Sequence, residues 1–320
     1  MTVLSLPQGP IHYRDLGPSD GPVLVFVHGL LVSGSIWDGV VARLASDFRC
    51  IVPDWPLGSH REPMNADADL SPVGIAEIIA SFLAALDLKD VTIVGNDSGG
   101  AITQIAMTQT TVRDRVSALV LTTCDAFDVF PPSPFGLLVE AARAPSIFRA
   151  SVRLMRAAPA LTKLPFAYGR VTKHALDRSL IDSWLRPCAE DPAVCRDVCK
   201  FLRALSPELT RRAAKLLPFV DVPALVLWTP EDESFPLALG ERLSKTLRRS
   251  ELELIDDALV FVAYDQPERT ADALRRFVAR ARRAAERNLV EDTERDGRSS
   301  MRSRAHASSA VPRPSAGPRH

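Results

Sequence analysis

The chain has 320 residues, of which 46% are hydrophobic and 24% are charged. Lysine and arginine together number 39, as do aspartate and glutamate, so the formal net charge is zero at pH 7. A chain without net charge has no global attraction to nucleic acid or to an anionic membrane, and we expect neither as a partner. The length is sufficient for one large domain built on a well-buried sheet.

Residues 1–17 lack the charged segment and apolar core of a secretory signal, and no window approaches the roughly 20 apolar residues that span a bilayer. We therefore expect a cytoplasmic protein. The five cysteines lack the spacing of a disulfide framework, which fits a reducing compartment. Cys188, Cys195 and Cys199 could share one helical face, but no histidine accompanies them, so buried thiols are favoured over a metal site.

Short β-branched runs alternate with longer helical patterns along most of the chain. This alternation is typical of a mostly parallel sheet covered by helices on both faces, and it predicts an α/β fold. The clearest helix is expected over Ser71–Asp87, with Ser71 as the N-cap and Pro72 at the first helical position. The expected strands are Ile11–Asp15, Val23–Val27, Arg49–Pro53, Val91–Gly95, Val116–Leu121, Ala224–Trp228 and Glu251–Ile255.

From residue 126 to residue 217 the alternation stops, and a helical stretch rich in proline and arginine replaces it. We interpret this stretch as a helical cap inserted into a core that comprises residues 1–125 and 218–285. Beyond residue 285 the sequence holds few large apolar residues, so it cannot bury enough surface to fold. Residues 286–320 are therefore expected to form a disordered tail.

The most specific local pattern is the segment VTIVGNDSGG, residues 91–100, in which an apolar strand runs into a Gly-x-Asp-x-Gly turn and then a helix. This is the pattern of a nucleophile elbow, with Asp97 where serine is more usual. Residues two before and two after the nucleophile must be small to avoid colliding with it, and Gly95 and Gly99 meet that need. Reading the turn one residue later would make Ser98 the nucleophile, but Asn96 would then be bulkier than the first small position prefers.

A second motif, VLVFVHGLL at residues 23–31, places a His-Gly turn after an early strand. In such a turn the backbone N–H of the next residue supplies half of an oxyanion hole. Leu30 and Ser98 would then donate the two amides. His28 is interpreted as a structural residue of the turn.

These motifs make the sequence resemble the α/β-hydrolase superfamily, and within it the aspartate-nucleophile branch of haloalkane dehalogenases and epoxide hydrolases. The resemblance covers about residues 10–285 and implies an α/β-hydrolase fold with an inserted helical cap. Further similar segments are Asp54–His60, the strand and loop at 225–236 and the start of the last helix at 265–268. The resemblance implies that Asp97 is the nucleophile and that Asp232 is the triad acid, with Asp125 as an alternative acid.

The general base that the resemblance implies is missing. The family's histidine follows the final strand, and alignment of the flanking segments places Val260 at that position. No histidine lies between His174 and His306. His60, in a loop at the carboxyl end of its strand, and His174, in the cap, are the remaining candidates, and Asp256, Asp257 and Asp265 are further possible bases near the vacant position.

The motifs leave two functions open. One is hydrolysis of a small apolar halide, epoxide or ester through Asp97; the other is a catalytically impaired or non-hydrolytic relative that binds a small ligand or a partner. The residues with which haloalkane dehalogenases bind the halide and epoxide hydrolases protonate the epoxide are largely absent. Leu30 and Ser98 stand at the halide-binding positions, and Tyr168 is the only tyrosine in the sequence of the expected cap. Trp184, Phe166 and Phe148 could line an apolar pocket. We expect no cofactor and no metal, because no phosphate-binding loop, dinucleotide fingerprint or ligand spacing is present, and the sequence leaves the oligomeric state open.

Overall fold

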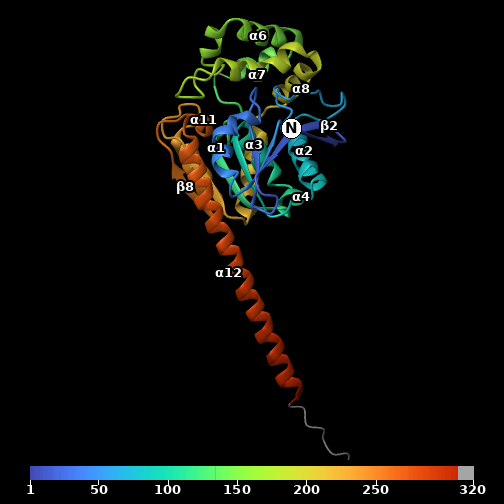
Figure 1. Cartoon of the computed structure of the whole chain (residues 1–320), viewed down its shortest axis with the longest axis vertical. Coiled ribbons are helices and arrows are strands. Elements are labelled where there is room, and N and C mark those ends of the chain that lie inside the picture. Colours follow the sequence, from blue (N-terminus) through green and yellow to red (C-terminus); the bar gives the residue numbers. More distant parts are fainter. Residues whose placement is uncertain (134, 309–320) are drawn as a thin grey trace, which may run out of the picture. The chain divides into compact units, whose positions relative to one another are not determined.

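A single eight-stranded sheet forms the centre of the protein (Figure 1). The computed structural model describes residues 1–133 and 135–308, and their side chains as far as residue 287. The strands lie in the order β1-β2-β4-β3-β5-β6-β7-β8, and all neighbours from β4 to β8 are parallel. Their bounds are Thr2–Leu6, Gly9–Leu16, Val23–Val27, Arg49–Pro53, Val91–Asp97, Val116–Cys124, Ala224–Trp228 and Ser250–Leu254, for β1 to β8.

The predicted fold class and the seven expected strands are confirmed, three of them with identical bounds. The sequence prediction missed β1, which pairs antiparallel with β2 at the sheet edge. Most of the side chains of β1 are exposed, so this strand lacks the continuous apolar run that marks the buried strands.

The helices of the described residues have the following bounds. These are α1 Asp38–Leu44, α2 Pro72–Ala85, α3 Ser98–Ala106, α4 Thr110–Arg113, α5 Gly136–Ala141, α6 Pro145–Ala157, α7 Arg178–Glu190, α8 Pro192–Arg203, α9 Pro207–Leu216, α10 Leu237–Thr246, α11 Val262–Asp265 and α12 Pro267–Ser308, with short 3₁₀ turns η1 Gly34–Trp37, η2 Pro159–Lys163 and η3 Leu217–Phe219. The expected cap of α2 is confirmed, since the Ser71 hydroxyl accepts from the Gly74 N–H and Pro72 opens the helix.

The order of the strands creates a switch point between β3 and β5. From β3 the chain passes through α1 to β4 on one side, whereas from β5 it passes through α3 to β6 on the other. Because crossovers are right-handed, α1 and α3 cover opposite faces. Ligands of parallel sheets bind outside the carboxyl ends of the strands at such a point, and here the pairing of β3 with β5 ends at Val27 and Gly95.

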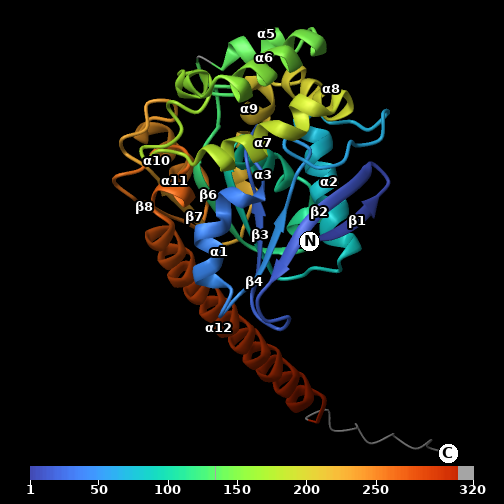
Figure 2. The ribbon, with the colours of Figure 1, turned by 45° about the horizontal axis from the view of Figure 1, so that its top comes forward.

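Helices α5 to α9 occupy the segment between β6 and β7 where the sequence predicts an inserted cap. Helix α6 packs against α7 and α8, and these three helices gather at one end of the sheet (Figure 1, Figure 2). The division into core and cap stays a prediction. Helix α12 continues to Ser308, although the sequence predicts a tail without regular structure from residue 286. Alanine, arginine and glutamate have high helix propensity without needing a buried face. The part of that prediction in residues 309–320 lies outside the described residues.

All five cysteines are buried free thiols. Within the described part of the chain, no cluster of His, Cys, Asp or Glu side chains has the arrangement of a metal site. No helix of the described residues combines the length and the apolar character required to cross a bilayer.

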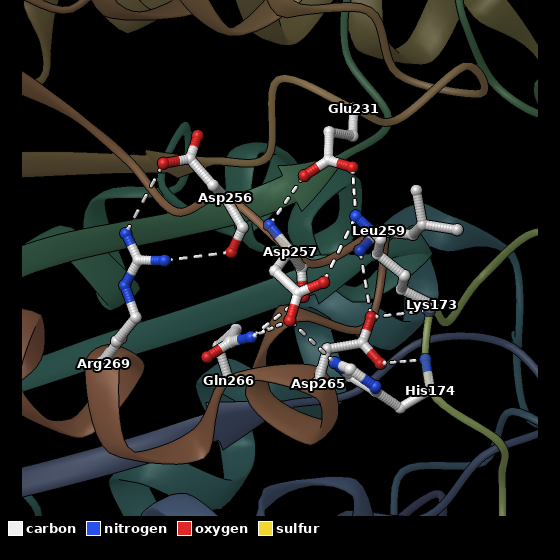
Figure 3. A network of polar contacts seen from close by, with 9 residues as sticks. All are labelled: Lys173, His174, Glu231, Asp256, Asp257, Leu259, Asp265, Gln266 and Arg269. Atoms are coloured by element: carbon white, nitrogen blue, oxygen red, sulfur yellow. Dashed lines mark hydrogen bonds and ion pairs between the residues drawn. The ribbon is translucent and has the colours of Figure 1, made fainter.

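A polar network fixes the segment that follows β8 (Figure 3). The Asp265 carboxylate accepts from the backbone N–H groups of Lys173 at 2.9 Å, His174 at 3.0 Å and Leu259 at 3.0 Å. Phe261 also donates its N–H to the Val171 carbonyl at 2.7 Å. This segment is therefore joined to residues 171–174, which lie between η2 and α7.

We predict that Asp265→Ala lowers the free energy of unfolding by about 3 kcal/mol, because it leaves three partly buried N–H groups without their acceptor. Asp265→Asn should cost less, since one amide oxygen remains. Asp256→Ala is the matched control in the same loop, since its pair with Arg269 is exposed and such pairs contribute less than about 1 kcal/mol. Urea unfolding measures all three variants, and equal losses for Asp265→Ala and Asp256→Ala would contradict the prediction.

Candidate functional site

The residue at the tip of the elbow is Asp97, which ends β5 immediately before α3 begins at Ser98. Its backbone has φ 55° and ψ −137°, a conformation that a residue with a side chain adopts only at a cost of about 1–3 kcal/mol. A Cβ on Gly99 would lie 2.3 Å from the His28 carbonyl oxygen, so only glycine fits there. The elbow is therefore centred on Asp97 rather than on Ser98, which is the first residue of α3.

The His-Gly turn after β3 approaches Asp97 closely. A Cβ on Gly29 would lie 2.0 Å from Asp97 Oδ2, so glycine is required for this contact. The Leu30 N–H donates to Ser98 Oγ at 2.9 Å, and the Ser98 hydroxyl lies 3.5 Å from Asp97 Oδ2. The two expected oxyanion-hole residues thus stand beside the carboxylate.

Burial raises the pKa of Asp97 to about 7. Hydrogen bonds from the backbone N–H groups of Ser98 and Leu30 stabilise the charged form and oppose this rise, whereas the negative charge of Asp232 adds to it. At neutral pH the carboxyl group is therefore divided between its protonated and ionised forms.

A mainly apolar cavity, partly open to solvent, lies in front of Asp97. Its polar side chains belong to Asp97, Ser98, Asp125 and Tyr168, and the Tyr168 hydroxyl donates to the Leu31 carbonyl at 2.6 Å. Among the described residues that line it there is no histidine, lysine or arginine. The apolar lining comprises Leu30, Leu31, Phe130, Pro131, Pro132, Phe135, Leu138, Met155, Phe166, Ala167, Val171, Leu185, Phe201, Leu205 and Phe261.

Of the three aromatic residues proposed from the sequence, only Phe166 lines this cavity. Phe148 and Trp184 are completely buried elsewhere, and Trp184 donates its indole N–H to Ser35 Oγ at 2.8 Å. Sequence reasoning missed Phe261, which follows Val260 directly, and Phe130 and Phe201, which no local pattern separates from ordinary core residues.

Asp232 lies in the loop after β7 and does not line the cavity. Its Oδ1 accepts from the Phe235 N–H at 2.6 Å, and the Ser234 and Val260 N–H groups also donate to this carboxylate. Burial nevertheless raises the pKa of Asp232 to about 6. Its Oδ2 is buried and has no hydrogen-bond partner among the described residues.

Position 260 stands between the elbow and Asp232. The Val260 carbonyl accepts from Asn96 Nδ2 at 2.7 Å, while its N–H faces Asp232. Asn96, the residue that argued against the alternative elbow frame, therefore has a structural role that the sequence did not indicate. These backbone contacts hold residue 260 between the elbow that carries Asp97 and the loop that carries Asp232, and the residue there is valine.

Neither candidate histidine reaches the cavity. The buried His60 ring accepts from the Gly58 N–H at 3.3 Å through Nδ1 and lies 3.4 Å from Asp197 Oδ2 through Nε2. The half-exposed His174 lies 3.1 Å from Asp257 Oδ2. Both rings are thus oriented by acids outside the cavity.

The remaining residues proposed as bases also lie elsewhere. Asp256, Asp257 and Asp265 belong to the network of Figure 3 rather than to the cavity lining. His28, expected to be structural, accepts from the Trp55 N–H at 2.8 Å, and burial lowers its pKa to about 4. Its ring thus helps to hold the turn after β3.

Comparison with known proteins agrees with this geometry. The model of a family described as "Alpha/beta hydrolase family" matches residues 24–273. A cis-3-alkyl-4-alkyloxetan-2-one decarboxylase from Xanthomonas campestris is 28% identical over 298 residues, covering 84% of this chain and 92% of that protein. Epoxide hydrolase 2 from Caenorhabditis elegans is 24% identical over 274 residues, covering 81% and 74%. A solved haloalkane dehalogenase from Bradyrhizobium elkani superposes with a TM-score of 0.72 at 18% identity, covering 88% of this chain and 97% of that one.

The chain belongs to the alpha/beta hydrolase family, because the family model matches most of its length. The predicted α/β-hydrolase fold and the likeness to haloalkane dehalogenases are confirmed. The protein is accordingly a hydrolase by family, with its subclass left open.

We predict that Asp97→Asn stabilises the protein at alkaline pH. The pKa rises from an ordinary value of 3.8 to about 7 on folding, so the wild type loses stability as pH rises through this window and remains less stable above it. Asparagine does not titrate. The advantage of the variant should grow by on the order of 3 kcal/mol between pH 5 and pH 8, since one pKa unit corresponds to about 1.4 kcal/mol. Urea unfolding at both pH values measures it, and an advantage that shrinks with pH would contradict the assignment.

Proposed function

We propose that the protein hydrolyses a small apolar substrate, a halide, an epoxide or an ester, through nucleophilic attack by Asp97. The observation that carries this proposal is the elbow itself: a strained turn presents the carboxylate to an apolar cavity. Strain of this kind persists only where the surrounding structure enforces it, and it is concentrated at active sites. A cavity of this lining suits a small apolar molecule.

In the proposed reaction, the ionised Asp97 attacks an sp³ carbon and displaces the leaving group, which produces an alkyl ester of its own carboxyl group. Water then attacks the ester carbonyl, and the N–H groups of Leu30 and Ser98 stabilise the oxyanion. Two relatives are named for substrates with small oxygen rings, an oxetan-2-one and an epoxide. These names favour a ring with an oxygen leaving group over a halide.

Val260 replaces the histidine that would activate this water. The unpartnered Oδ2 of Asp232 supports this proposal, because a buried acceptor without a donor is costly. An imidazole N–H from position 260 would supply such a donor. The second candidate function is binding of an apolar ligand without turnover, favoured by the lack of an imidazole among the described lining residues.

The first test incubates the protein with a terminal epoxide, an iodoalkane and an ester, and follows intact mass and product. We expect an adduct on Asp97 that Asp97→Asn does not form, because an amide is a poor nucleophile. The covalent bond is located by peptide mapping. Saturable binding of the substrates without adduct or turnover would favour the ligand-binding function instead.

We further predict that Val260→His accelerates release of the ester adduct formed from the iodoalkane by about 100-fold or more, the usual contribution of a general base. The measurement is the decay of adduct mass after excess substrate is removed. Val260→Leu, which enlarges the side chain without adding an imidazole, is the matched control. Equal release by both variants would argue against position 260 as the site of the missing base.

A further inference from the structure

Asp125 is a second carboxyl group in the cavity, and the steps above do not use it. It follows β6 directly, and the Cα register pairs Cys124 of β6 with Asp97 of β5. Asp125 therefore stands one residue beyond the partner of Asp97, at the same edge of the sheet. Both residues line the cavity.

The backbone of Asp125 is anchored, whereas one oxygen of its carboxyl group has no partner among the described residues. Its carbonyl oxygen accepts from Gln104 Nε2 at 2.7 Å, which anchors the backbone. The residue is only 2% exposed, yet its Oδ1 has no hydrogen-bond partner among the described residues. Because a buried polar atom without a partner is costly, its persistence indicates a group whose partner arrives with the ligand.

The surroundings determine where the proton of this pair resides. Burial, reinforced by the charge of Asp97, raises the pKa of Asp125 well above its ordinary range. The pKa of Asp97 rises only to about 7, because the N–H groups of Ser98 and Leu30 stabilise its charged form. When one of the two carboxyl groups ionises, it is therefore Asp97, and Asp125 keeps its proton.

We propose that Asp125 is a catalytic acid and base that takes over the task of the missing histidine, and that the substrate is consequently one with an oxygen leaving group, such as an epoxide. This inference rests on the proposed role of Asp97. An expelled alkoxide is a strong base and needs a proton as the bond to carbon breaks, whereas a halide does not.

Both steps balance in protons and electrons. In the first, an Asp97 oxygen bonds to carbon, the carbon–oxygen bond of the epoxide breaks, and its electron pair takes the proton of Asp125. In the second, the Asp125 carboxylate removes a proton from water, whose oxygen attacks the Asp97 carbonyl carbon. The ester bond breaks, the diol leaves with one proton, and both acids return to their initial states.

The other polar side chains of the cavity are less suited to this task. The Tyr168 hydroxyl is engaged by the Leu31 carbonyl, and the Ser98 hydroxyl accepts from Leu30 and faces Asp97. Asp232 stays outside the cavity and is held by backbone N–H groups. Asp125 combines the two features that this task needs, because it lines the cavity and its Oδ1 has no hydrogen-bond partner among the described residues.

The test compares 1,2-epoxyhexane with 1-iodohexane, since only the epoxide needs a proton. In Asp125→Asn we expect formation of the epoxide adduct to slow by about 100-fold or more, while the iodohexane adduct forms within about threefold of the wild-type rate. Asp232→Asn is the matched control, because it also removes a buried acid near Asp97. It should change both rates by the same factor.

A pH profile of the wild type provides evidence that does not depend on folding of a variant. The iodohexane rate should rise through about pH 7 as Asp97 ionises and then stay level. The epoxide rate should rise in the same way and fall again at higher pH, where Asp125 loses its proton. A level epoxide profile would overturn the inference.

The outcomes separate this inference from the proposed function. Equal slowing of both substrates in Asp125→Asn, or no slowing of either, would overturn the role of Asp125 while leaving Asp97 as the nucleophile. If the wild type forms no adduct even with iodohexane, the role of Asp97 fails and that of Asp125 fails with it. A selective loss of the epoxide reaction supports both.

Discussion

The site depends on the backbone turn in which β5 becomes α3. Its geometry is enforced from two sides, because Gly99 packs against the end of β3 and Gly29 packs against the Asp97 carboxylate. These contacts exist only because β3 and β5 are neighbours in the sheet, although more than 60 residues separate them. The strain at Asp97 is thus maintained by the pairing of the central strands, and the position of its carboxyl group is a property of the sheet as a whole.

The electrostatics of the cavity follow from burial of acids without a nearby base. Asp97, Asp125 and Asp232 are brought together by the ends of β5, β6 and β7, and the described residues that line the cavity carry no positive charge. Basic side chains such as Lys173 instead pair with acids at the surface network of Figure 3. Carboxyl groups in such a setting retain protons at pH values where exposed acids have lost them, as the proposed roles of Asp97 and Asp125 require.

The segment after β8 is fixed by contacts on both sides of Val260. Asp265 ties it to residues 173 and 174, and Asn96 and Asp232 hold Val260 from either side. The valine is buried and fits this position, so the fold does not require an imidazole there. The proposed replacement of a histidine by Val260 is therefore compatible with an intact fold.

The sequence by itself determined the α/β fold, most strands, the elbow at Asp97 and the absence of a histidine near residue 260. These features are local, since strand periodicity, glycine spacing and capping residues are written in short stretches of chain. Only the tertiary structure decided which polar residues share the cavity, because this depends on strand order and on side chains from distant segments. It separated Asp125, which lines the cavity, from Asp232, which does not, and it placed His60 and His174 beside other acids. No local pattern carries that information, because the partners of each side chain lie tens of residues away in the chain.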